Sequence, residues 1–211
     1  LAPVSSSTFS NGNTITWTSR NLEINTTLSA ANTQAFTHVL SVTYDVGYPY
    51  HAFLELARYR WFFDDGGEAN ANPIVPENTP ISSGFYPGDA LRLRFLIQNT
   101  GLGATTTRLQ LEYASSGCAT WYPVPTLSSS KEWEIRSTQH VLHGTLATNR
   151  SAISDPDGLG FVSGYVSTNA NPIPPLALDA RSFSELEWSI GSSGIVASTV
   201  PYCFRMTKSD G

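Results

Sequence analysis

The chain has 211 residues, of which 14% are charged, whereas roughly 25% is the average for soluble domains. Aromatic residues make up 11% of the chain, which argues against disorder, and a formal net charge of -5 offers no basic footprint for nucleic acid. Scarce lysine and glutamate argue against a mainly helical fold, and no stretch approaches the roughly 20 apolar residues of a membrane-spanning helix.

The N-terminal 50 residues are expected to form an arm that carries additional strands. Residues 1–13 are small, polar and without periodicity, which predicts a flexible start. The opening residues, Leu1 to Val4, have neither the basic nor the apolar region of a signal peptide, as expected of a mature secreted chain or of a chosen boundary. Residues 22–28 and 36–46 then alternate apolar and polar side chains, and this period of two predicts half-buried strands.

Residues 51–211 continue with short segments of the same kind, separated by turns rich in Gly, Pro, Asn and Asp. The expected strands are residues 56–63, 91–97, 108–113, 132–135, 161–166, 183–190 and 200–206. Such a series predicts an all-β fold, specifically an antiparallel β-sandwich. The only helical feature that the sequence suggests is a single turn near residues 139–142.

The alternation also assigns the two faces of the longest strands. The side chains expected to face the core are Leu91, Leu93, Phe95, Ile97, Leu186, Trp188 and Ile190. The side chains expected to face the solvent are Arg92, Arg94, Glu185, Glu187 and Ser189. These arginines, with Arg58 and Arg60, would form ladders with Glu112 across neighbouring strands, which stabilise a sheet modestly.

The two cysteines and two sequons bear on the compartment. Cys118 and Cys203 are compatible with two buried free thiols or with one disulfide formed in an oxidising compartment, and they lack the CxxC spacing of a zinc site. Asn25 and Asn149 each begin an Asn-x-Ser/Thr triplet. They are therefore candidate glycosylation sites if the source organism glycosylates its proteins.

No pattern in the chain predicts an enzyme. A Gly-x-Ser-x-Gly elbow is absent, and none of the four histidines has an acidic residue at a telling spacing. Glu185 and Glu187 share a strand face, as do Glu132 and Glu134, and glycoside hydrolysis on a sandwich needs two facing carboxylates. Any solvent-facing strand shows the same spacing, so we favour that simpler interpretation.

Calcium is the one cofactor for which the chain offers candidates. The turns Asp64-Asp65-Gly66-Gly67 and Asp155-Pro156-Asp157-Gly158 bring oxygen ligands close together. Neither turn completes the spacing of a known calcium loop, and Asp and Gly are ordinary turn residues. We therefore expect no cofactor, with Asp64, Asp65, Asp155 and Asp157 as the alternative.

Aromatic residues at strand ends and in loops are candidates for stacking on sugars. They are Tyr48, Tyr50, Trp121 and Tyr122. Tyrosine and tryptophan in a sandwich more often pack in the core or along an edge. Surface glycans are therefore a candidate partner and not the first expectation.

An ordered set of segments resembles immunoglobulin- and fibronectin-like modules found in very large secreted or surface proteins of bacteria. The segments are Arg58-Tyr59-Arg60-Trp61-Phe62, Glu77-Asn78-Thr79-Pro80, Leu91-Arg92-Leu93-Arg94, residues 108–114 with Cys118 and Trp121, and residues 183–188 with 202–206. The resemblance covers about residues 55–207. It implies an immunoglobulin-like sandwich over residues 51–211, a structural, adhesive or spacer role without catalysis, and the pairing of Cys118 with Cys203.

The chain departs from these modules at both ends. They often continue past the strand that corresponds to residues 202–206, and about 50 residues precede the module here. We therefore expect residues 1–50 to supply a missing strand, either within the chain or to a neighbour. The positions expected to mediate assembly are Leu1, Val4, Phe9, Ile15, Trp17, Leu22, Ile24 and Leu28.

The function that these features favour is an extracellular or cell-surface structural protein whose partner is itself. It would be a filament, pilus-like or surface-layer subunit, with no nucleic-acid partner and no membrane span. The alternatives are a carbohydrate-binding or adhesive module and a viral capsid or tail protein. Charged edges defend sheets against pairing, and a chain whose only lysines are Lys131 and Lys208 has little of that defence.

Overall fold

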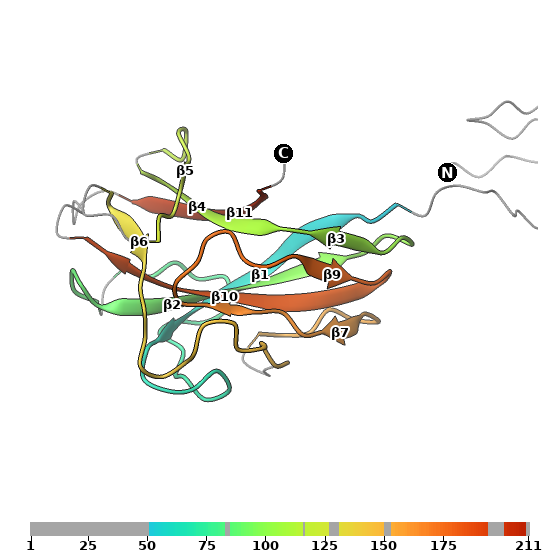
Figure 1. The fold of residues 1–211 in the computed structure, drawn as a ribbon, viewed down its shortest axis with the longest axis horizontal. Coiled ribbons are helices and arrows are strands. Elements are labelled where there is room, and N and C mark those ends of the chain that lie inside the picture. The colour runs from blue at the N-terminus through green and yellow to red at the C-terminus, as the bar shows by residue number, and fades with distance from the viewer. Residues whose placement is uncertain are drawn as a thin grey trace, which may run out of the picture. The chain divides into compact units, whose positions relative to one another are not determined.

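The computed structural model describes residues 51–82, 85–115, 117–126, 131–149, 153–193 and 201–209, which belong to one compact unit, Gly47–Gly211. These residues form strands and no helix, so the all-β prediction is confirmed (Figure 1). The strands are β1 (Leu54–Phe63), β2 (Ala90–Asn99), β3 (Thr105–Thr107), β4 (Leu109–Ser115), β5 (Tyr122–Pro123), β6 (Trp133–Ile135), β7 (Gly160–Val162), β8 (Val166–Ser167), β9 (Leu176–Leu178), β10 (Ser182–Ser192) and β11 (Tyr202–Lys208). The predicted strands 22–28 and 36–46 lie outside the described residues.

The strands form two main sheets and a short ribbon. The first sheet has the order β1-β2-β10-β6, and the second has the order β11-β4-β5. Strands β3 and β9 form the ribbon. All the long pairings are antiparallel, while the parallel pairings of β7 and β8 with β10 involve only two or three residues each.

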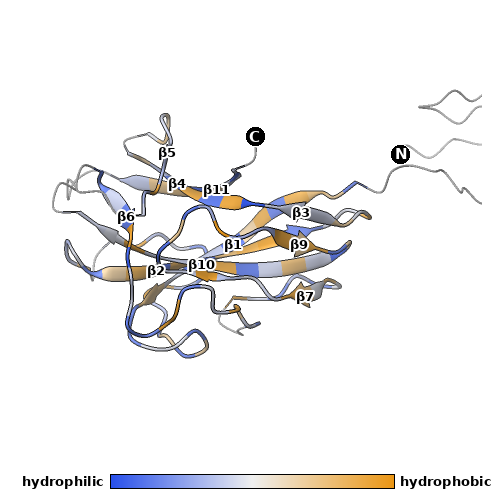
Figure 2. Cartoon of the chain, in the orientation of Figure 1, coloured by the Kyte–Doolittle hydropathy of each residue, from blue (hydrophilic) through white to orange (hydrophobic). Residues whose placement is uncertain are grey.

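One apolar core lies between the two main sheets, which Figure 1 shows as separate layers. The predicted core face is confirmed, because the side chains of Leu91, Leu93, Phe95, Ile97, Leu186, Trp188 and Ile190 are all buried in it. Strand β4 contributes Leu111 and Tyr113 from the opposite sheet. Aromatic edges join the sheets, since the ring of Phe204 on β11 lies 5.4 Å from Trp61 and 5.0 Å from Trp133. Figure 2 shows the resulting bands of apolar residues along the strands.

The other face of the first sheet is also buried, and here the prediction is wrong. Arg92, Arg94, Glu185, Glu187 and Ser189 were expected in solvent, but all five are completely buried. Alternation with a period of two assigns side chains to the two faces of a strand, but it does not predict what covers each face. Loop residues cover this one: the carbonyl of Gly66 bonds Arg92, Thr148 reaches Glu68, and Ile153 packs with Leu96 and Phe183.

Two local predictions also need correction. The expected strand 161–166 is interrupted between β7 and β8, because Gly164 approaches β10 so closely that a Cβ there would lie 2.0 Å from the carbonyl oxygen of Glu185. Residues 139–142 bend without forming a helical turn.

Candidate functional site

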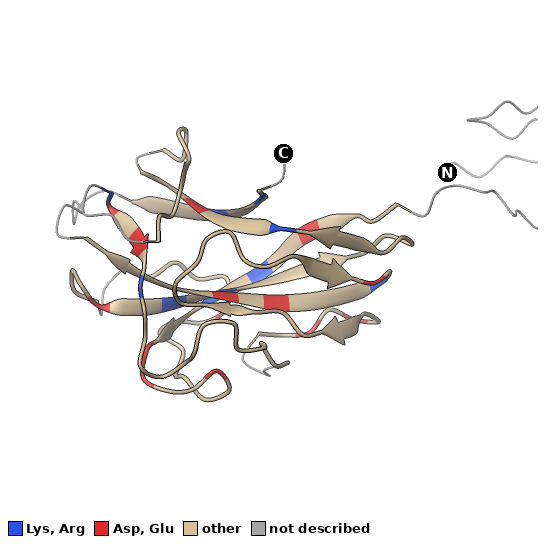
Figure 3. Cartoon of the chain, viewed as in Figure 1, with Lys and Arg blue, Asp and Glu red and all other residues tan. Residues whose placement is uncertain are grey.

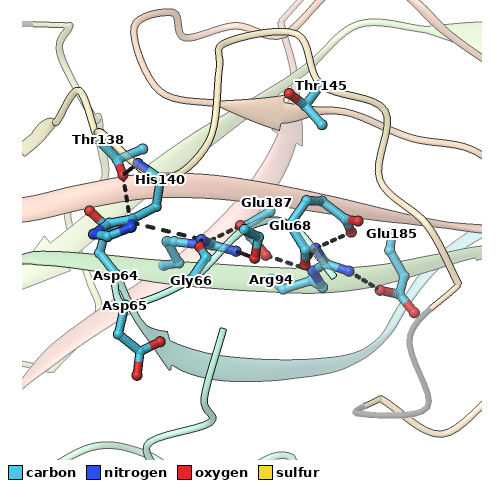
Figure 4. Close-up of polar contacts among 12 residues, drawn as sticks. Asp64, Asp65, Gly66, Glu68, Arg94, Thr138, His140, Thr145, Glu185 and Glu187 are labelled. Carbon is cyan, nitrogen blue, oxygen red and sulfur yellow. Dashed lines mark hydrogen bonds and ion pairs between the residues drawn. The ribbon is translucent and has the colours of Figure 1, made fainter. Parts of the chain in front are cut away.

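Buried charges gather on the covered face of the first sheet, and we call Arg92, Arg94, Glu68, Glu185 and Glu187 the ion-pair cluster (Figures 3 and 4). Arg94 is its centre. Its Nε lies 2.7 Å from Glu187 Oε2, its Nη1 lies 2.7 Å from Glu185 Oε2, and its Nη2 lies 2.6 Å from Glu68 Oε1. Glu187 Oε1 accepts a second hydrogen bond, at 2.7 Å, from Arg92 Nε.

Strand register places this cluster. Glu187 on β10 lies opposite Arg94 on β2, and directly opposite residues of an antiparallel pair share a face. The loop after β1 then supplies Glu68, which contacts Arg94 on this face of the sheet. Backbone and hydroxyl groups of Thr148 hold Glu68 with hydrogen bonds of 3.0 and 2.8 Å. The cluster thus connects the sheet to the loops that cover it.

The electrostatics of the cluster favour the charged forms of Arg94 and Glu68. Burial alone would lower the pKa of Arg94, but Glu187, Glu185 and Glu68 outweigh it and raise that pKa above its ordinary value. Burial alone would raise the pKa of Glu68, but Arg94 and the hydrogen bonds from Thr148 outweigh it and lower that pKa. Glu185 and Glu187, the candidate glycosidase pair, are therefore both turned into arginine contacts under the loop cover.

The acidic turns are occupied by contacts within the chain. Asp64 accepts a 2.6 Å hydrogen bond from Thr138, and Asp65 accepts two from Asn72 that lower its pKa. Asp155 accepts one from the side chain of Asn149, the exposed sequon residue, and Asp157 is exposed. Across the described residues no three His, Cys, Asp or Glu side chains gather as metal ligands. The expectation of no cofactor stays a prediction, with calcium as its alternative.

The candidate sugar-stacking residues have cationic neighbours. The guanidinium of Arg205 lies 4.1 Å from the ring centroid of Trp121, and the ammonium of Lys131 lies 4.8 Å from that of Tyr122. Arg205 also forms a 2.7 Å ion pair with Glu112, so the predicted ladder of Glu112 with the other arginines is wrong. Tyr48, Tyr50, Asn25 and the expected assembly positions between Leu1 and Leu28 lie outside the described residues.

A disulfide fixes the start of β11. Cys203 is bonded to Cys118, which follows β4, across a separation of 85 residues. The pairing implied by the family resemblance is therefore present, and the free-thiol alternative is wrong. The bond links the beginning of β11 to the segment that follows β4. Among the described residues, β4 is the only strand that pairs with β11.

Strand β11 is an incompletely covered edge. Within the described parts of the chain it pairs with β4 alone, and none of its seven residues is fully buried, whereas five of the seven in β4 are. Phe204 and Met206 pack against the core and are still only half-buried. We call the side of β11 away from β4, from Cys203 to Lys208, the open edge.

Strand β1, at the edge of the first sheet, is covered along part of its length. The backbone of residues 72–78 runs along β1, and its amides at Ile74 and Asn78 donate to the carbonyls of Trp61 and Tyr59. Nearer its start β1 resembles β11, because Leu56 lies opposite the core residue Ile97 and is nevertheless 45% exposed. Contact between Trp61 and Phe204 places these two edge strands on the same side of the core.

Sequence reasoning identified the arginines and glutamates of the strands and missed their loop partners. Glu68 and Thr148 lie outside any alternating segment, so no local pattern singles them out. The usable signal was the pairing of an Arg-x-Arg strand with a Glu-x-Glu strand. Had both been assigned to neighbouring strands, complementary charge on one shared face would have indicated a cluster.

The described residues contain no helix of the length and apolarity needed to cross a membrane. No family model, curated protein or solved structure matches this chain.

Proposed function

We propose that this protein is an extracellular structural subunit that self-assembles, through strand pairing by its N-terminal segment, into a filament, pilus-like fibre or surface layer. The observation that carries the proposal is the open edge of β11, beside half-buried Phe204 and Met206. Unpaired strand edges are templates for another strand, and main-chain hydrogen bonds then supply the affinity.

Three further observations support this assignment. The disulfide is compatible with an oxidising, extracellular setting. The open edge carries only Arg205 and Lys208 as charges, and Arg205 is already paired with Glu112. The ion-pair cluster fits a structural clamp, because its carboxylates contact arginines. The proposal includes an immunoglobulin-like sandwich and assigns no catalytic side chain.

A second candidate function is carbohydrate binding. Tyr122 is 40% exposed and lies next to Trp121, and the carboxylate of Glu112 is close by through Arg205. Aromatic rings beside charged groups suit sugar recognition. Retention of the chain on glycan resins, lost in a Tyr122→Ala variant, would favour this candidate over assembly.

Light scattering and negative-stain microscopy of the full chain test the first proposal. We expect a broad, very large species that contains regular assemblies. Ser41→Pro, within residues 36–46, should leave the chain monomeric because proline removes an amide needed for pairing, while Ser41→Thr should assemble normally. A native chain that remains monomeric at every concentration contradicts the proposal.

A further inference from the structure

We propose that the link between Asp157 and Gly158 is a site of spontaneous modification, at which the folded chain acquires an isoaspartate residue. The reaction favours aspartate followed by glycine, because glycine has no side chain to shield its backbone nitrogen. The described residues contain two such pairs, Asp65-Gly66 and Asp157-Gly158. The structure holds the first pair and leaves the second open, and this inference does not depend on the proposed function.

The reaction joins two groups of adjacent residues. The backbone nitrogen of Gly158 bonds to Cγ of Asp157, and a carboxyl oxygen leaves as water with the amide proton, which gives a five-membered succinimide ring. Water then adds to the former backbone carbonyl carbon of Asp157 and breaks its bond to that nitrogen. The chain now runs through the side chain of Asp157. One water has been lost and one gained, so the mass is unchanged and the backbone is longer by one carbon.

Both reacting groups at Asp157-Gly158 are accessible and uncommitted. The two residues are exposed. Within the described residues, the Gly158 amide donates no hydrogen bond and the Asp157 carboxylate accepts none. Gly158 has a φ of 71°, and the nearest atom to a Cβ built on it is Nη2 of Arg181, 3.9 Å away. The Asp157 side chain therefore has room to turn toward the nitrogen of Gly158.

The same groups at Asp65-Gly66 are held in place. The backbone and side-chain nitrogens of Asn72 donate hydrogen bonds of 2.9 and 2.8 Å to the Asp65 carboxylate. These bonds lower the pKa of Asp65 and so reduce the protonated form that can lose water. The carbonyl of Gly66 accepts a hydrogen bond from the buried Arg92, and a Cβ on Gly66 would lie 2.8 Å from Oδ1 of Asn70. Asp65 cannot turn toward Gly66 without breaking these contacts.

The product would change the loop cover of the first sheet. The turn that contains Asp157 connects Ile153, which packs with Leu96 and Phe183, to β7. The amide of Gly160 at the start of β7 donates to the carbonyl of Arg181. An added backbone carbon lengthens the connection between these two fixed points.

Incubation of the full native chain tests the inference. The chain is kept for several weeks at pH 5, where more of an aspartate is protonated than at pH 7, and is then digested. Electron-transfer fragmentation of the peptides distinguishes isoaspartate from aspartate. We expect the isoaspartate fraction at Asp157 to be at least fivefold that at Asp65. In concentrated urea, where the fold holds neither pair, the two sites should react at similar rates.

Two variants serve as controls. Asp157→Glu should remove the signal at this position, because its longer side chain would have to close a six-membered ring. Asn72→Ala, which removes one of the two hydrogen bonds to Asp65, should raise isoaspartate at Asp65 and leave Asp157 unchanged.

Three results would overturn the inference. The first is as much isoaspartate at Asp65 as at Asp157 in the native chain. The second is no isoaspartate at Asp157 in the native chain while the urea-treated chain reacts. The third is a difference between the sites that persists in urea, since the flanking sequence and not the fold would then select the site.

Discussion

At the residue scale, the ion-pair cluster decides how the first sheet is covered. Five ionisable groups are buried together, and each arginine bonds both a strand carboxylate and a loop oxygen. Buried ion pairs contribute little net stability compared with apolar packing, but the loss of one partner leaves an uncompensated charge. The cluster therefore makes the loop cover specific to this sheet.

Glu187→Gln should be the most damaging conservative change in the cluster, because the Glu187 carboxylate accepts hydrogen bonds from the Nε atoms of both Arg92 and Arg94. We expect the free energy of unfolding to fall by about 3–5 kcal/mol. Glu55→Gln on β1, where the side chain is exposed, is the matched control and should stay within about 0.5 kcal/mol of the native chain. Urea unfolding measures both values, and equal stabilities would refute the structural role of the cluster.

Acid should weaken the fold partly through Glu68. Its folded pKa is lowered, so its contribution is present above the unfolded pKa of about 4.3 and is lost as pH falls through the folded pKa. Glu68→Gln should therefore be less stable than the native chain at pH 7 and should lose less stability on acidification. Thr148→Val, which removes one hydrogen bond to Glu68, should show a smaller change in the same direction. Unfolding at pH 7, 5 and 3 checks this, and identical pH profiles for all three chains would contradict it.

At the element scale, the sequence predicts the long strands well and the short ones poorly. Predicted strands 56–63, 91–97 and 183–190 lie within β1, β2 and β10, because each carries enough alternating residues to define its faces. Strands β3, β5 and β9 have only two or three residues, too few to show a period. The candidate site was only half predictable, since the cover over Arg94 comes from Glu68 and Thr148, which are distant in sequence.

Gly164 is the element-scale position most sensitive to an added methyl group. Gly164→Ala would place Cβ 2.0 Å from the backbone oxygen of Glu185, so β10 or the segment between β7 and β8 must move. We expect a loss of about 1–3 kcal/mol in unfolding free energy. Gly160→Ala, with no atom within 4 Å of the new Cβ, is the control and should be nearly neutral. Similar denaturation midpoints for the two variants would refute this account.

Loss of the disulfide should destabilise mainly β11. The Cys118→Ser/Cys203→Ser double variant opens a link across 85 residues, and the chain-entropy model gives an upper loss of about 4–5 kcal/mol. We expect faster hydrogen exchange in residues 203–208 before any change in β2 or β10. Native chain treated with reductant should match the double variant. If hydrogen exchange became equally faster in all strands, the disulfide would not act locally on β11.

At the scale of the whole molecule, the two edge strands differ in how the described chain covers them. Residues 72–78 cover the end of β1, while β11 presents Phe204 and Met206 beside an edge that the rest of the described chain does not pair. Met206→Lys should therefore reduce assembly strongly, because the charge of the introduced lysine would have to be buried beneath an added strand. Light scattering checks this, with Met206→Leu as the control that should assemble normally.

Electron cryomicroscopy of the assembled native chain tests the central claim most directly. We predict a regular assembly in which a strand from the N-terminal segment of a neighbouring subunit lies beside Cys203–Lys208 of β11. An assembly in which this edge of β11 faces solvent, or in which its own chain fills it, would contradict the account.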